Sequence, residues 1–79
     1  MEEYTITYKQ LSLFHRIAIT HFVHAQSEYK RSLEYYGNEN EFVVQMNKKD
    51  FIRACDALIE IEKLLGYDYS GTVKEREAL

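Results

Sequence analysis

The stretch of this sequence from Tyr8 to Tyr36 has no helix-breaking residue. It contains neither glycine nor proline, the two residues that most disfavour the interior of a helix. Thr7 and Gln10 have the spacing of a capping box, in which a threonine hydroxyl and a glutamine side chain each bond the other's backbone N–H. Gly37 follows and suits the left-handed conformation in which many helices end. We therefore predict one long helix over residues 8–36 of this 79-residue chain.

A second helix is predicted over residues 48–65. Asn47 is the expected N-cap, because its side chain can accept a hydrogen bond from the first turn. Asp50 then lies near the positive end of the helix dipole. Gly66 has the position at which a left-handed residue ends a helix.

The remaining segments leave the fold class open in one respect. Thr72 and Glu75 again have capping-box spacing, which predicts a short helix over 73–79. The segments 4–8 (YTITY) and 42–46 (FVVQM) alternate as strands do, so two short strands are the alternative. We expect one small all-α domain spanning 1–79, with the helices forming a hairpin.

Composition excludes several classes of protein. The formal charge of −3 argues against a general nucleic-acid binder, which is usually basic. Cys55 is the only cysteine, so no disulfide forms within the chain, and a lone thiol suits a reducing compartment. The opening residues MEEYTITYKQ lack the apolar run of a signal peptide. We expect a cytoplasmic protein without membrane contact.

Both predicted helices carry more apolar surface than one partner helix can cover. In the first helix the stripe from Leu11 to Tyr36 at helical spacing is the expected core, and in the second the stripe from Phe51 to Leu65. Further apolar residues lie outside these stripes. We therefore predict a homodimer that completes a four-helix bundle. A docking face for another protein, or a C-terminal segment that folds back, would also cover this surface.

The predicted interface combines the surplus aliphatic residues with tyrosines near the end of the first helix. Tyrosine is enriched at interfaces, although these rings could instead plug the end of the bundle. The interface residues are Leu13, Ile17, Ile19, Val23, Ile52, Ile59, Tyr35 and Tyr36.

Three side chains share one flank of the first helix and could approach a metal. His21, His24 and Glu28 have the spacing i, i+3 and i+7, and imidazole and carboxylate suit zinc or iron. The alternative, which we favour, is that they form a polar border to the core, with His24 and Glu28 as an i, i+4 pair. No metal or other cofactor is therefore predicted.

Arg16 and His21 form an R-x4-H string. It resembles the motif of the helical HEPN ribonucleases, where arginine and histidine act on RNA phosphate at a dimer interface. The resemblance implies that one group holds the phosphate and the other moves a proton. It covers these two residues alone; Ile17 stands where the family usually has a polar residue, and the family's domain is longer. We rank it below a structural role.

Two polar residues fall on the expected core stripes. His15 lies among the apolar residues of the first helix, and Glu62 lies between Leu58 and Leu65 on the second. A buried carboxylate needs a partner. We expect His15 to be one candidate partner, with exposure of Glu62 at the stripe's edge as the alternative.

The expected function follows mainly from missing motifs and surplus apolar surface. The sequence has no P-loop, no dinucleotide-binding glycine pattern and no zinc spacing of cysteines, so no catalytic residue is predicted. We expect a non-enzymatic interaction module, such as a regulator, adaptor or inhibitor, of a kind common among phage and mobile-element products. The alternatives are a nucleic-acid-associated regulator using Arg16, Lys30 and Arg31, and the ribonuclease-like or metal-binding protein.

Overall fold

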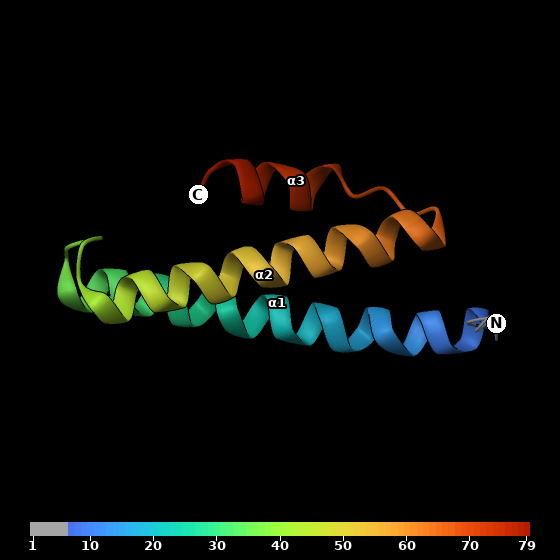
Figure 1. The fold of residues 1–79 in the computed structure, drawn as a ribbon, viewed down its shortest axis with the longest axis horizontal. Helices are drawn as coiled ribbons and strands as arrows, with labels where there is room; N and C mark the ends of the chain where they lie inside the picture. The colour runs from blue at the N-terminus through green and yellow to red at the C-terminus, as the bar shows by residue number, and fades with distance from the viewer. Residues whose placement is uncertain (1–6) are drawn as a thin grey trace, which may run out of the picture.

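The computed structural model describes residues 7–79, and this part of the chain forms three helices and no strand. Helix α1 spans Tyr8–Tyr36, α2 spans Phe42–Leu65 and α3 spans Ser70–Glu77. Helices α1 and α2 run antiparallel, and α3 returns along α2 on the side away from α1 (Figure 1). The molecule measures 47 × 26 × 19 Å. The predicted all-α hairpin is confirmed, with a third helix packed on it.

The local signals at both ends of α1 are confirmed. Thr7 Oγ1 accepts from the backbone N–H of Gln10 at 3.2 Å, and Gln10 Oε1 accepts from the backbone N–H of Thr7 at 2.9 Å. Gly37 has φ 63° and donates its N–H to the carbonyl of Leu33 at 2.8 Å. The helix therefore begins and ends at the residues that its capping pattern predicts.

Helix α2 begins at Phe42, six residues before the predicted start at 48. The strand alternative for 42–46 is also wrong, because this segment forms the first turns of α2. Asn47 is not the N-cap but lies inside the helix, where its Nδ2 donates to the carbonyl of Glu28 at 3.3 Å. Glu41 caps the helix without a side-chain hydrogen bond. Val44 is fully buried, so packing against the rest of the fold stabilises this first turn where no cap does.

The structure also tests the predictions for the two ends of the chain and for the end of α2. In the segment 4–8, Thr7 is the N-cap of α1 and Tyr8 is helical, while 4–6 lie outside the described residues. Helix α3 begins at Ser70, three residues before the predicted start. Thr72 does not cap it; its hydroxyl donates instead to Glu62 Oε1 at 3.1 Å. Gly66 does end α2, with φ 75°.

The core lies between α1 and α2, nearer the loop that joins them. Phe51 is its largest fully buried side chain, and its ring packs against Phe22 and Tyr29 at centroid distances of 5.3 and 6.1 Å. Burial of such a ring stabilises the fold by about 1.5–3 kcal/mol. The buried cluster consists of Ala25, Tyr29, Val44, Phe51, Ala54 and Cys55.

None of the three helices is both long and apolar enough to span a bilayer, within the residues that the structure describes.

Candidate functional site

Two cross-helix contacts distinguish the two faces of the α1–α2 hairpin. On one face, His15 Nε2 lies 3.6 Å from Glu62 Oε2, and Glu62 also accepts from Thr72 of α3. On the other, His21 Nε2 lies 3.3 Å from Asp50 Oδ1. Helix α3 therefore covers part of the face that carries His15 and leaves the face that carries His21 open.

The uncovered face is lined by large apolar side chains from both helices. Phe14 and Ile17 precede His21 by seven and four residues, and Val43 and Leu64 lie seven and fourteen residues from Asp50. Such spacing places residues on one side of a helix. Each member is between 43% and 67% exposed. We call this surface the open face: Leu13, Phe14, Ile17, Val43, Met46 and Leu64.

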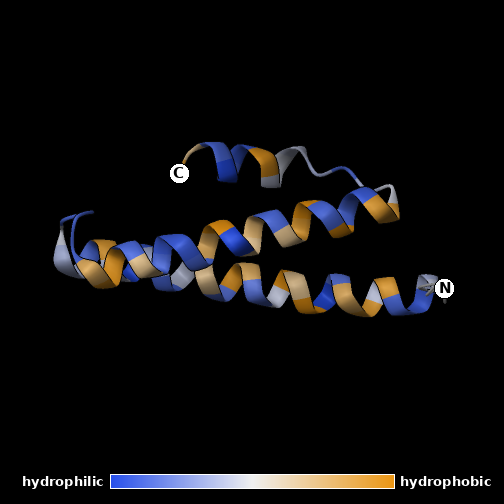
Figure 2. Cartoon of the chain, viewed as in Figure 1, coloured by the Kyte–Doolittle hydropathy of each residue, from blue (hydrophilic) through white to orange (hydrophobic). Residues whose placement is uncertain are grey.

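Hydrophobic segments recur along the whole of α1 and α2, whereas α3 is mainly hydrophilic (Figure 2). A shallow hollow of about 600 Å³ lies on the outer surface of α1, with every lining residue contributed by that helix. Leu13 and Ile17 supply its apolar part. His21 also lines the hollow and contacts Asp50 of α2. The hollow is an extension of the open face rather than an enclosed cavity.

The remaining predicted interface residues lie elsewhere. Ile19 and Val23 are 40% and 52% exposed on the opposite flank of α1. Ile52 and Ile59 are half-buried on α2. At the end of α1 the rings of Tyr35 and Tyr36 contact each other at 4.9 Å, and both remain exposed.

The predicted metal ligands do not gather into a site. Residues 7–79 contain no group of three histidine, cysteine or acidic side chains arranged to hold a metal ion. His21 contacts Asp50 instead, and Glu28 Oε1 lies 3.3 Å from Arg31 Nη1. The hypothesis that His21, His24 and Glu28 bind one metal ion is therefore not supported.

The arginine and histidine of the R-x4-H string line the same hollow on α1. Arg16 and His21 are both exposed, but His21 faces the carboxylate of Asp50. Lys30 and Arg31, the other basic residues considered for nucleic acid, are also exposed, and Arg31 is engaged by Glu28.

His15 and Glu62 lie beside each other, which is one of the two alternatives that the sequence left open for Glu62. Their side chains are only 16% and 13% exposed, yet His15 Nε2 is buried without a hydrogen-bond partner. The His15 ring packs edge-on against Tyr67 at 5.2 Å, and the hydroxyls of Tyr67 and Tyr8 are 3.2 Å apart. Sequence reasoning missed Tyr67 and Thr72 because the pattern of α2 does not reveal how the following segment returns.

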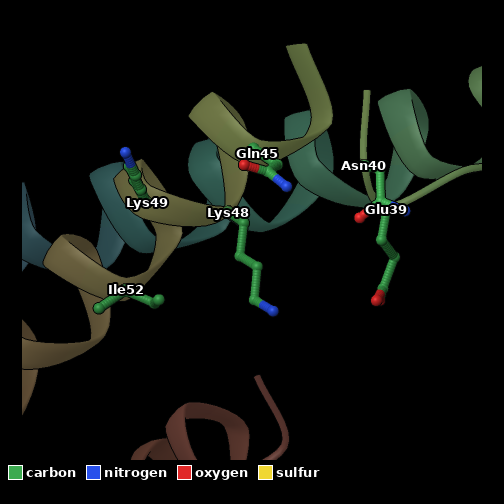
Figure 3. A pocket seen from close by; sticks show the side chains of 6 residues that line it. All are labelled: Glu39, Asn40, Gln45, Lys48, Lys49 and Ile52. Carbon is green, nitrogen blue, oxygen red and sulfur yellow. The ribbon is translucent and has the colours of Figure 1, made fainter. Parts of the chain in front are cut away.

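A second hollow, of about 380 Å³, lies where the 37–41 loop meets the start of α2. In Figure 3, Lys48 and Glu39 extend to the same side of the ribbon while Lys49 points away from them. The hollow combines acidic, basic and amide groups without a buried nucleophile. Because opposite charges line it, it favours no single ligand charge.

Cys55 is fully buried and packs in the core cluster. Burial raises the pKa of its thiol to about 11; the carboxylate of Asp56 adds to the rise and Arg76 opposes it. Because the thiolate is the reactive form, this buried and protonated cysteine is unreactive in the folded protein.

Comparisons with protein-family models, with curated proteins and with solved structures give no match.

Proposed function

We propose that this protein is a non-enzymatic protein–protein interaction module, acting as a regulator, adaptor or inhibitor through its open face, and that two copies dimerise through that face. The single observation that carries the proposal is that α1 and α2 each expose three large apolar side chains of the open face, which helical spacing assigns to the side of the His21–Asp50 contact. Extended apolar patches of this kind mark interaction sites in small proteins.

The total surface of the chain supports a partner. Its accessible area is 6115 Å², about a fifth more than the roughly 5000 Å² expected of a compact monomer of 9.4 kDa. A standard interface buries about 800 Å² on each partner. Covering the open face with a second copy would remove an area comparable to this excess.

The shape of the molecule also suits pairing of two copies. The shortest dimension is 19 Å, and α1 and α2 lie side by side along the longest (Figure 1). Two open faces in contact would bring four helices together as a bundle, leaving α3 outside. In this arrangement His21 and Asp50 of each copy would lie near the centre, where His21 of one copy could contact Asp50 of the other across the two-fold axis.

The expected affinity is moderate. Full burial of one large apolar side chain stabilises by about 1.5–3 kcal/mol, so covering one that is half exposed yields about 1 kcal/mol. Twelve such side chains in a dimer give about 12 kcal/mol, which is of the same order as the association cost of about 4–15 kcal/mol. The dimer should therefore dissociate on dilution.

Light scattering coupled to size exclusion tests the proposal over a range of protein concentrations. The wild-type mass should rise from 9.4 kDa toward twice that value as concentration increases. Ile17→Asp should abolish the rise, because it places a charge in the apolar centre of the open face. Val23→Asp is the matched control, since Val23 is similarly exposed on the opposite flank of α1, and it should leave the rise unchanged.

A constant mass of 9.4 kDa for the wild-type chain at all concentrations would refute dimerisation. Equal loss of the dimer in both variants would show that the open face is not the surface responsible.

A further inference from the structure

Helix α3 is held to the rest of the fold by few contacts. It has eight residues and none of them is buried. Isolated helices shorter than about 12 residues are marginal in water, so α3 depends on the surface beneath it. Within the described chain it packs on α2, and Gln26 of α1 adds one hydrogen bond to Glu75 at 3.4 Å.

Three side chains hold the segment after Gly66 against the rest of the fold: Thr72 and Arg76 of α3, and Leu79 beyond its end. Thr72 donates to Glu62 at 3.1 Å, and Arg76 Nε donates to Asp56 Oδ1 at 3.1 Å. Leu79 packs against the core cluster. Their spacing of i, i+4 and i+7 places them on one side of the helical segment, so a single stripe contacts α2.

The surface beneath this stripe is apolar and contains the only thiol. Cys55 is completely buried, and the charges of Arg76 and Glu75 both act on it. Ile52 and Ile59 lie three residues before and four residues after Cys55, on the same side of α2, and are half-buried. We call these three residues the covered surface.

We propose that α3 is a displaceable cover, and that the covered surface is a second docking site for a helix of a partner protein. The partner helix would carry a hydroxyl, a basic and an aliphatic residue at the spacing of Thr72, Arg76 and Leu79. This site lies on the other face of the hairpin from the open face and does not depend on dimerisation.

Charge complementarity defines the chemistry of this partner. The rim of the covered surface offers the carboxylates of Asp56 and Glu62, and the last turn of α3 carries Lys74 and Arg76. The two partners of the Arg76–Asp56 pair are 40% and 57% exposed, so the pair is weak. The cover should therefore open in a local transition that leaves the hairpin folded.

The thiol of Cys55 reports this opening in the full-length chain. A thiol-reactive disulfide reagent at pH 8 should label wild-type protein slowly, because the buried thiol is both covered and protonated. Arg76→Ala should raise the labelling rate about two- to five-fold, the range for loss of an exposed ion pair. Arg31→Ala is the matched control, since it removes an exposed ion pair with Glu28 away from α3, and its rate should match the wild type.

Docking is tested by adding a synthetic peptide of residues 67–79, which contains no cysteine, to the Arg76→Ala protein. An excess of this peptide should bind the covered surface and slow labelling back toward the wild-type rate. A peptide carrying both Arg76→Ala and Leu79→Ala should give no protection.

Two results would overturn the proposal. If Arg76→Ala labels no faster than Arg31→Ala, α3 is not a separately opening cover. If labelling accelerates but the wild-type peptide gives no protection, the covered surface does not bind a helix in trans. Because all these rates are measured on Cys55, they separate this proposal from dimerisation, which is read from the mass and from Ile17→Asp.

Discussion

Replacing Phe51 with alanine should cost a large share of the protein's stability. Phe51 is 2% exposed and its ring contacts those of Phe22 and Tyr29, so the change removes buried area and leaves a cavity. Such substitutions typically cost about 3–5 kcal/mol. A domain of this length has a total stability of about 4–12 kcal/mol. The variant should therefore lose between about a quarter and all of this stability.

Phe14→Ala is the matched comparison, because it makes the same chemical change on the open face. Phe14 is 45% exposed, so about half of the transfer free energy is lost and no closed cavity forms. We expect a cost of about 1 kcal/mol in the monomer. Urea unfolding followed by helical circular dichroism, at a concentration where the wild-type chain is monomeric, measures both values.

The two phenylalanine variants also separate core from interface. A dimer that forms through the open face should raise the wild-type unfolding midpoint with protein concentration, and Phe14→Ala should reduce this dependence. A cost for Phe51→Ala of less than about 1.5 kcal/mol, or one equal to that of Phe14→Ala in the monomer, would contradict the packing described here.

Two further predictions concern the backbone and the thiol. Gly37→Ala should destabilise the protein by about 1 kcal/mol because φ is 63° there. Gly71 lies at a helical position with open space around it, so Gly71→Ala should be neutral or stabilising by up to about 1 kcal/mol. Thermal unfolding measures both variants, and a loss of equal size in the two would contradict the prediction. Because burial raises the pKa of Cys55 from 9.0 to about 11, its contribution to stability is present below pH 9 and is lost as the pH rises from 9 to 11, by on the order of 1–3 kcal/mol. Cys55→Ala should flatten this part of the curve of unfolding free energy against pH, and parallel curves for the two proteins would show that the thiol is not responsible.

The accuracy of the sequence-based boundaries depended on whether the signal was local. Helix α1 was predicted to the residue because Thr7, Gln10 and Gly37 act within their own turns. Asn47 is the opposite case, since its side chain bonds the carbonyl of Glu28 on another helix. Nothing in its immediate neighbours indicates that contact, so Asn47 was predicted as the N-cap although it lies six residues after the actual N-cap, Glu41.

The same distinction applies to the surfaces. Helical periodicity identified Leu13 and Ile17 as lying outside the core stripe, and it placed His15 and Glu62 on stripes that face each other. It assigned Ile52 and Ile59 to the predicted interface, but both are half-buried, because their exposure depends on where α3 packs. Leu79, which contacts the core, lies beyond the last predicted stripe, and its role requires the path of the whole segment after Gly66.

The location of the core near the loop has a consequence for the order of folding. Asn47 and Glu28 are 19 residues apart in sequence, whereas His15 and Glu62 are separated by 47. Closing the longer span first would cost about 1 kcal/mol more in chain entropy. The hairpin should therefore form first beside its loop and close progressively toward the pair of Tyr8 and Tyr67, and that end should be the first to separate when the protein unfolds.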